Sequence, residues 1–131
     1  MQKVVFGVIS FSLNETTRGL IGTHELGLMK PTAWLVNVAR AEIIDGEALY
    51  QALAERRIAG AAIDVWYRYP QDQSPTWPAS QAFHELPNVL MRPHVAGGSE
   101  GTVQARVAVV AENIARLVRG ERPIDLVERP S

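Results

Sequence analysis

Three polar residues in this chain carry side chains that could act together on a small acid: Arg40, Asp64 and His94. Each follows closely on a short apolar run typical of a buried β-strand, and these runs are Trp34–Val38, Gly60–Ile63 and Val89–Met91. In a doubly wound parallel sheet, the carboxyl ends of successive strands lie side by side and ligands bind along that edge. A guanidinium, a carboxylate and an imidazole in one crevice predict a site that binds a small anion and transfers a proton.

His94 lies between Pro93 and a run of small residues that includes Gly97 and Gly98. Such glycines would let a ligand approach the backbone closely, and an imidazole at a strand end can donate or accept a proton near neutral pH. An isolated histidine in this position is more often a hydrogen-bonded surface side chain. Because Arg40 and Asp64 are expected to lie near His94, a functional role for His94 is favoured instead.

Arg40 and Asp64 each have an ordinary structural alternative. Arg40 could form an ion pair with Glu42 or Asp45 rather than hold a ligand carboxylate through two parallel hydrogen bonds. Asp64 ends an apolar strand, where an unpaired carboxylate is costly. It could accept a hydrogen bond from a ligand amide, or it could act as a cap or pair with Arg68. The residues alone leave these alternatives open.

The composition of the 131-residue chain excludes several classes of function. The formal net charge is −1 and no run of Lys or Arg is present, which argues against binding to nucleic acid or to an anionic membrane. Without cysteine there are no disulfides, thiolate zinc sites or cysteine nucleophiles. The three histidines are not at metal-ligand spacing, so we expect no metal site. The apolar start is too short to span a bilayer, and we expect a cytoplasmic protein.

Strand and helix patterns alternate along the chain. Strands are predicted at Val4–Ser10, Ala33–Val38, 60–65 and Val89–Met91, and helices at 23–29, from an Asp45 cap to about Ile58, and from a Ser99 cap to Arg119. The first strand reads as one that is covered on both faces. The segment Tyr67–Leu86 holds three prolines and one tryptophan and is predicted to be a long, ordered, irregular connection. These patterns predict an α/β fold with a mostly parallel sheet of about four strands and a long C-terminal helix.

Four segments of the sequence resemble the D-isomer-specific 2-hydroxyacid dehydrogenases. NVARAEIIDGEAL, starting at Asn37, resembles the family signature N-x-x-R-G-x-x-[VI]-D-x-x-A-L. The other three are SLNETTRGLIG from Ser12, GAAIDVW from Gly60 and LPNVLMRPHVAGGSEGT from Leu86. All four occur in the family's order and spacing, and together they cover almost the whole chain. The resemblance implies a Rossmann-like, doubly wound sheet.

The resemblance also implies a chemistry and a role for each site residue. Family members move a hydride between a nicotinamide and a 2-keto or 2-hydroxy acid. Arg40 would clamp the substrate carboxylate and touch the cofactor, and His94 would protonate the keto oxygen or take the hydroxyl proton. Asp64 would hold the nicotinamide carboxamide. The remaining cofactor-binding residues would be Leu13, Val38, Ala39 and Gly97, for a cofactor that is NAD or NADP.

Position 69 departs from the family pattern. The family usually places a glutamate there, within D-V-x-x-x-E-P, whereas this chain has Tyr69. A neutral phenol can orient an imidazole by a hydrogen bond but offers it little charge. Either a carboxylate from elsewhere takes that place, or His94 titrates at a lower pH than in relatives, which is the alternative we favour. The carboxylates considered are Glu85, Asp72 and Glu100. A second, milder departure is Ala41 in place of the glycine after the arginine.

Two parts of the family pattern are missing from the sequence. No G-x-G-x-x-G follows a strand, and this loop normally cradles the pyrophosphate of the dinucleotide. The substrate domain is also missing. We therefore expect residues 1–131 to be one partial dinucleotide-binding domain, its second half plus a crossing helix over 99–119. The cofactor site would be incomplete, with weak or no turnover by the chain alone.

A second hypothesis belongs to another class of function. The chain would be a non-catalytic domain derived from the enzyme that self-associates or binds a partner. An exposed sheet edge and an apolar helix stripe need cover, and a homodimer formed by exchange of the C-terminal helix would supply it. Because an interaction domain needs neither Arg40 nor His94, the enzyme hypothesis is favoured, with a small 2-keto or 2-hydroxy acid as partner.

Overall fold

The computed structural model describes residues 4–72 and 74–125. The chain divides into two compact units, Met1–Val95 and Ala96–Ser131, which are described separately below.

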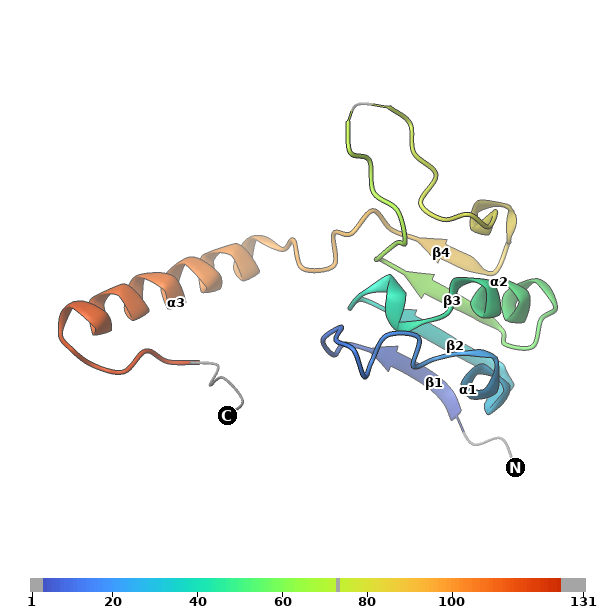
Figure 1. Ribbon diagram of the computed structural model, residues 1–131, viewed down its shortest axis with the longest axis horizontal. Helices are drawn as coiled ribbons and strands as arrows, with labels where there is room; N and C mark the ends of the chain where they lie inside the picture. Colours follow the sequence, from blue (N-terminus) through green and yellow to red (C-terminus); the bar gives the residue numbers. More distant parts are fainter. Residues whose placement is uncertain (1–3, 73, 126–131) are drawn as a thin grey trace. The chain divides into compact units, whose positions relative to one another are not determined.

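The first unit is built on a four-stranded parallel sheet (Figure 1). In sheet order, which is also chain order, the strands are β1 (Val4–Ile9), β2 (Met29–Asn37), β3 (Gly60–Ile63) and β4 (Val89–Met91). Ile9, Asn37, Ile63 and Met91 form one row across the sheet. The predicted parallel α/β architecture is confirmed, and all four strands therefore end at the same edge.

Two helices pack on one face of this sheet: α1 (Thr23–Gly27) and α2 (Gly46–Ala54) (Figure 1). Asp45 begins α2 as predicted, because its carboxylate accepts a hydrogen bond from the Ala48 backbone N–H at 2.8 Å. Two short 3₁₀ turns, η1 (Ala41–Ile43) and η2 (Phe83–Glu85), complete this layer. The core between helices and sheet is fully apolar at its centre, and it includes Leu26, Ile43, Leu49, Leu53 and Phe83.

The helix predicted over residues 23–29 is shorter than expected, and the second strand is longer. Helix α1 ends at Gly27, and β2 already begins at Met29, which pairs with Val4. Between this pair and the pair of Phe6 with Trp34 the register shifts. Pro31, which has no N–H to donate to a ladder, is accommodated within that irregular stretch. The pairing of Met29 with β1 thus ends the helix before the residue at which the local sequence predicts its end.

Helix α2 also ends earlier than predicted, at Ala54 instead of Ile58. Arg56 adopts a left-handed backbone conformation with φ of 57°, which breaks the helical repeat before Ile58. Ile58 is nonetheless fully buried, so the apolar residue that suggested more helix belongs to the turn into β3.

The sheet face opposite α1 and α2 carries exposed apolar side chains. Phe6 is 62% exposed and Val8, Trp34 and Leu90 are exposed as well. The prediction that the first strand is covered on both faces is therefore wrong. Strand alternation sends Ile9 to the helical face and Val8 to the other.

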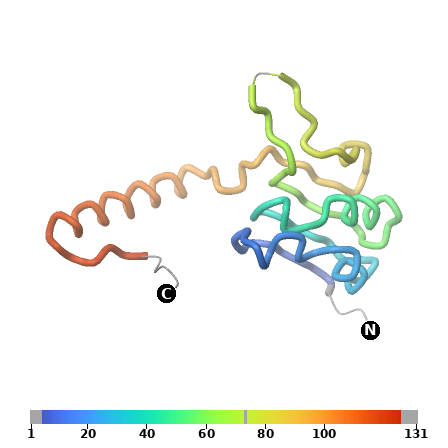
Figure 2. The backbone as a smooth tube through the Cα atoms, viewed as in Figure 1, coloured from blue at the N-terminus to red at the C-terminus, as the bar shows by residue number. Residues whose placement is uncertain are grey.

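The connection from β3 to β4 is irregular, as predicted, apart from η2 (Figure 2). Within its described part, the Arg68 N–H donates to the Pro78 carbonyl at 3.0 Å. Phe83 inserts into the core, edge-on to both Tyr50 and Trp66. Aromatic packing therefore orders this connection against the sheet.

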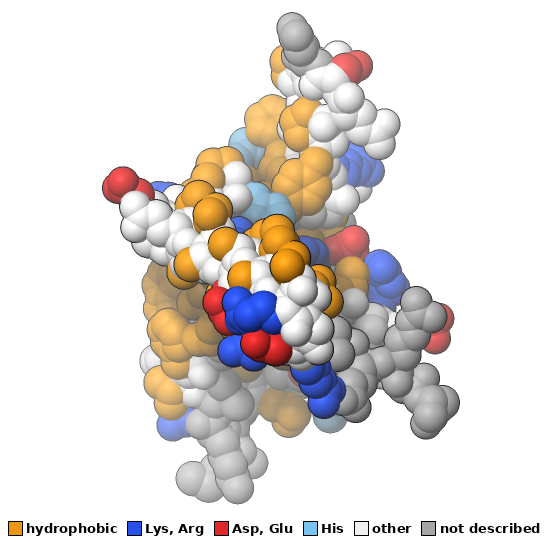
Figure 3. Space-filling view, turned by 90° about the vertical axis from the view of Figure 1, so that its left-hand side faces the viewer, with side chains coloured by type: hydrophobic (Ala, Val, Ile, Leu, Met, Phe, Trp, Pro, Cys, Tyr) orange, Lys and Arg blue, Asp and Glu red, His pale blue; other side chains and the backbone are white. Residues whose placement is uncertain are grey.

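The second unit contains one long helix, α3 (Glu100–Val118). The predicted Ser99 cap forms, since its hydroxyl accepts from the Thr102 N–H, and Gly120 ends the helix with φ of 72°. Apolar side chains along α3 stand at the surface (Figure 3), and these include Val103, Val107, Val110, Ile114 and Leu117. Over the described residues, no helix combines the length and the apolar character needed to cross a membrane.

Candidate active site

The residues that follow β2, β3 and β4 are held at one level by a series of backbone hydrogen bonds. The first residue after each of these strands donates its N–H to a carbonyl on the neighbouring strand. That carbonyl belongs to the last residue of the strand that comes before it in the sequence. The three bonds run from Val38 to Ile9 (3.2 Å), from Asp64 to Asn37 (3.0 Å) and from Arg92 to Ile63 (2.9 Å). Arg40 and His94 each lie two residues beyond this level. Two strand spacings, about 10 Å in total, separate β2 from β4.

A buried asparagine shapes the backbone that carries Arg40. The Asn37 side chain is 1% exposed, accepts a hydrogen bond from the Ala39 N–H and donates to the Arg40 carbonyl, each at 3.0 Å. Arg40 itself is exposed, and its Nη1 donates to the Ala39 carbonyl at 2.6 Å. A ligand carboxylate would compete with that single internal bond.

In the described part of the chain, Arg40 does not form the alternative ion pair with Glu42 or Asp45. Glu42 lies 4.0 Å from the Arg18 guanidinium, and Asp45 is engaged as the cap of α2.

A cleft lies between the ends of β1 and β2. Its volume is about 480 Å³, and the residues that line it are Ser10, Phe11, Ser12, Leu13, Val38, Ala39 and Arg40. Four predicted cofactor-binding residues, Leu13, Val38, Ala39 and Arg40, are thus brought together on one cleft. Its polar groups and its position at the carboxyl edge of the sheet fit part of a dinucleotide.

Asp64 holds the backbone on the far side of His94. Asp64 is 5% exposed, and its Oδ1 accepts a hydrogen bond from the Val95 N–H at 2.9 Å. The capping alternative is therefore realised. The alternative partner Arg68 donates to the Ser80 hydroxyl at 2.7 Å.

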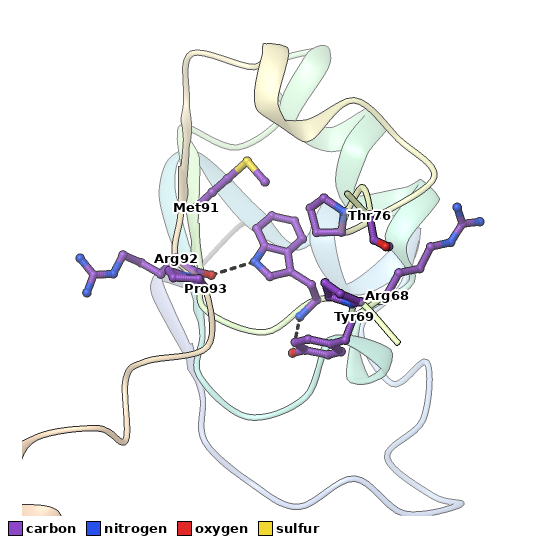
Figure 4. A pocket seen from close by; sticks show the side chains of 9 residues that line it. Arg68, Tyr69, Thr76, Met91, Arg92 and Pro93 are labelled. Atoms are coloured by element: carbon purple, nitrogen blue, oxygen red, sulfur yellow. Dashed lines mark hydrogen bonds between the residues drawn. The ribbon is translucent and has the colours of Figure 1, made fainter. Parts of the chain in front are cut away.

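His94 is held in an uncommon backbone conformation. Its φ is 59°, in the left-handed region that non-glycine residues rarely occupy, at a cost of about 1 kcal/mol or more. Pro93 restricts the chain before it, and the Asp64–Val95 bond fixes the chain after it. The Trp66 indole N–H donates to the Arg92 carbonyl at 2.9 Å, which secures the strand end (Figure 4).

The imidazole of His94 meets Tyr69, the residue that stands where the family pattern given in the sequence analysis has a glutamate. Tyr69 Oη lies 3.0 Å from His94 Nδ1, and the two rings are 5.6 Å apart. The carboxylates proposed as substitutes are engaged elsewhere. Glu85 lies 3.8 Å from His84, and Asp72 accepts the Ser74 N–H at 2.7 Å. The partner of Nδ1 is therefore the phenol.

Glu100 and the predicted cofactor residue Gly97 both belong to the second unit. The prediction for Gly97 stays a prediction.

A second cavity adjoins Tyr69 and the end of β4 (Figure 4). It has a volume of about 410 Å³, and Trp66, Met91, Pro93 and Tyr69 lie on its wall together with Arg68 and Arg92. The Trp66 indole therefore separates the core from this cavity while it secures the segment that leads to His94.

Asn37 and Trp66 have positioning roles that sequence analysis missed. Asn37 is the one strongly polar side chain within the run 33–38, a signal that could have marked it as a buried hydrogen-bonding group. For Trp66 the sequence offers no comparable signal, because the partner of its indole is a backbone carbonyl 26 residues away.

Tyr67 links the segment after β3 to the helical layer. Its hydroxyl donates to the Ile44 carbonyl at 3.0 Å. Burial, followed by the nearby charges of Asp45 and Glu42, raises the pKa of Tyr67 well above its ordinary value. In the described part of the chain, no group of three or more His, Cys, Asp or Glu side chains could hold a metal ion.

A parallel sheet whose carboxyl edge combines a polar cleft with a guanidinium and an imidazole defines a dinucleotide-binding type of fold. The sequence model for "D-isomer specific 2-hydroxyacid dehydrogenase, NAD binding domain" matches residues 2–96. The chain belongs to this family.

Individual relatives agree with this assignment. The chain is 38% identical over 124 residues to a glyoxylate reductase of Thermococcus gammatolerans, an alignment that covers 95% of the chain and 35% of that protein. Among solved structures, a D-isomer specific 2-hydroxyacid dehydrogenase of Lactobacillus delbrueckii ssp. bulgaricus, in its NAD-complexed form, superposes with a TM-score of 0.84. It is 28% identical, and the match covers 97% of this chain and 40% of that one.

A second solved relative, from Xanthobacter autotrophicus Py2, was crystallised with NADPH and MES. Its TM-score is 0.77 at 29% identity, over 94% of this chain and 48% of that one. The chain therefore spans about a third of the length of its curated relatives and less than half of these solved ones.

Proposed function

We propose that this chain contributes the catalytic edge of an NAD(P)-dependent oxidoreductase of the D-2-hydroxyacid dehydrogenase type. One observation carries the proposal: Arg40 and His94 stand two residues beyond the same hydrogen-bonded level of one parallel sheet, with Asp64 between them. Family membership supports the same chemistry.

In the reductive direction, Arg40 binds the carboxylate of a 2-keto acid through paired N–H donors and so orients its carbonyl group. Residues 10–13 and 38–40 would hold the nicotinamide cofactor, which would supply the hydride to the carbonyl carbon. His94, doubly protonated, gives its Nε2 proton to the carbonyl oxygen as the C=O π bond breaks, and the ring is left neutral. Oxidation of the 2-hydroxy acid follows the same path in reverse.

The cleft formed by residues 10–13 and 38–40 fits part of a dinucleotide, and Arg40 lies where it can touch cofactor and substrate. In this proposal Asp64, whose Oδ1 accepts the Val95 N–H, and Gly97 contact the carboxamide of the nicotinamide. The cofactor is NAD or NADP, because similar proteins were crystallised with either.

The remaining proposals concern organisation. Residues 1–131 form the second half of a dinucleotide-binding domain plus its crossing helix, the working enzyme is a homodimer, and its place is the cytoplasm.

Cofactor binding can be tested on the chain itself by titrating the ¹⁵N-labelled protein with NADH and NADPH and following amide shifts. We expect weak binding that perturbs Leu13 and Val38–Arg40, and weaker binding by Arg40→Gln. Arg56→Gln is the matched control, since Arg56 precedes β3 and so lies toward the amino-terminal edge of the sheet. Shifts confined to the opposite edge of the sheet would contradict the proposed cleft.

Catalysis can be tested in a chimera in which this chain replaces its aligned segment in the Thermococcus gammatolerans glyoxylate reductase. We expect NADH oxidation with glyoxylate, lowered at least about 100-fold by His94→Gln, the usual size of an acid–base contribution. Arg56→Gln serves again as the control. A folded chimera whose activity is unaffected by His94→Gln would rule out the proposed role of the imidazole.

The alternative function, a self-associating or partner-binding domain, is favoured by one observation. Phe6, Trp34 and Leu90 on the sheet, and the stripe on α3, are exposed. Analytical sedimentation at rising concentration discriminates: a persistent monomer removes the case for homodimerisation by exchange of the C-terminal helix.

A further inference from the structure

We propose that Tyr69 is a positioning residue that selects the tautomer of His94, so that the neutral imidazole carries its proton on Nε2. The inference deepens the proposed function and rests on it for its catalytic meaning.

The argument starts from the hydrogen-bonding capacity of one oxygen. A phenol has one O–H donor and two acceptor lone pairs. The Trp66 backbone N–H, which can only donate, points to Tyr69 Oη at 3.0 Å and occupies one lone pair (Figure 4). The other neighbour of this oxygen is His94 Nδ1, also at 3.0 Å.

Two arrangements remain for the bond to His94. Either the Tyr69 O–H donates to a bare Nδ1, or a protonated Nδ1 donates to the second lone pair of Oη. In the second arrangement the phenolic O–H must turn to water, because within the described part of the chain the hydroxyl contacts these two groups alone. The first arrangement pairs the phenolic O–H with Nδ1 inside the protein and leaves Nε2–H as the donor for a ligand or water.

The Trp66 N–H strengthens the first arrangement further. A donor bound to a hydroxyl oxygen polarises its O–H, and successive hydrogen bonds in a chain reinforce one another. Trp66 is itself buried, at 6% exposed, and its indole N–H donates to the Arg92 carbonyl. The phenol is therefore directed to Nδ1 by a fixed group.

A carboxylate at position 69 would do the opposite. An ionised carboxylate is an acceptor only, so it selects the tautomer with the proton on Nδ1 and leaves Nε2 bare. With Tyr69 the neutral ring presents Nε2–H, which can donate a hydrogen bond to a carbonyl oxygen but cannot accept the hydroxyl proton of a 2-hydroxy acid.

When the ring is doubly protonated, Nδ1 carries a proton, and the phenol must rotate so that its oxygen accepts a hydrogen bond from Nδ1–H while its own O–H donates to solvent. After Nε2 has protonated a substrate oxygen, the ring is neutral with its proton on Nδ1. Return to the Nε2–H tautomer then requires Nδ1 to release its proton to water and Nε2 to take one up from water, while the Tyr69 hydroxyl rotates to donate to the bare Nδ1. Oxidation requires the reverse exchange, to the Nδ1–H tautomer, before Nε2 can accept the hydroxyl proton.

The test measures the nitrogen chemical shifts of the histidine rings in the ¹⁵N-labelled 131-residue chain. The measurement is made at about pH 9, above the ordinary histidine pKa near 6.5, so that the rings are neutral. His24 and His84, both exposed, are internal references, and His24 is the cleaner one because the Glu85 carboxylate lies 3.8 Å from His84 Nε2. In the wild type we expect His94 to show a pyrrole-type Nε2 and a pyridine-type Nδ1 more completely than the references do.

Three variants complete the test. Tyr69→Phe moves His94 toward the tautomer mixture of the reference rings, and Tyr69→Glu inverts the assignment to Nδ1–H. Tyr67→Phe, which removes a phenolic hydroxyl bonded to the Ile44 carbonyl, leaves His94 unchanged.

A wild-type spectrum with the proton on Nδ1 overturns the proposal even if a variant fails to fold. So does a folded Tyr69→Phe variant with unaltered His94 shifts. Failure of the proposed function shows up separately, as the absence of nucleotide-induced shifts while the tautomer is as expected.

Discussion

Replacement of Asn37 by alanine tests whether the backbone of the candidate cleft is held by a buried amide. The side chain makes two hydrogen bonds at 3.0 Å, to the Ala39 N–H and to the Arg40 carbonyl, and is 1% exposed. Each bond contributes about 1 kcal/mol, and the buried Ala39 N–H left without a partner costs about 1–3 kcal/mol. Because these contributions overlap, we expect Asn37→Ala to lower the free energy of unfolding by about 2–4 kcal/mol.

The assay is urea unfolding of the chain followed by tryptophan fluorescence, with amide shifts as a second readout. Asn113→Ala is the matched control. Asn113 bonds in the same two-fold way to the Ile124 N–H (2.8 Å) and carbonyl (3.2 Å), but its surroundings are half-exposed. Water can replace those bonds, so we expect a loss below about 1 kcal/mol.

The reasoning is refuted if the two variants lose the same stability. It is also refuted if Asn37→Ala keeps the wild-type amide shifts of Val38–Arg40 and the wild-type response to NADH.

Three further predictions concern the first unit. Gly60→Ala places a Cβ 2.6 Å from the Trp34 ring and 2.6 Å from the backbone carbonyl of Asn88, the residue before β4, so we expect a loss of about 1–3 kcal/mol in urea unfolding. Gly27→Ala, with open space around it, is the control and should lose nothing. Because the pKa of Tyr67 is raised in the folded state, the neutral phenol stabilises the fold below the ordinary tyrosine pKa, and this stability is lost as pH rises above about 10. Urea unfolding at alkaline pH should therefore be less pH-dependent in Tyr67→Phe, and equal slopes would contradict this. Asp64→Ala removes the acceptor of the amide that follows His94, so hydrogen exchange at that amide should quicken by about tenfold, the equivalent of one hydrogen bond of about 1.4 kcal/mol. Unchanged exchange would show that the carboxylate does not hold this turn.

Much of the fold follows from local sequence because its signals are short-range. The apolar runs before Asp64 and His94 became β3 and β4, and the caps Asp45 and Ser99 begin helices where expected. These residues act through neighbours three positions away, which a sequence displays directly. Where a distant strand decided the outcome, as at Met29, local signals misled.

The candidate site divides in the same way. The sequence by itself determined which chemical groups stand at the sheet edge, since a polar residue just past an apolar strand has one place to go in a parallel sheet. Only the tertiary structure decided what surrounds them. Tyr69 meets His94 across 25 residues, and Asp64 binds the Val95 amide across 31. Such pairings depend on how connections of irregular structure fold back over the sheet, and no periodic pattern in the chain encodes them.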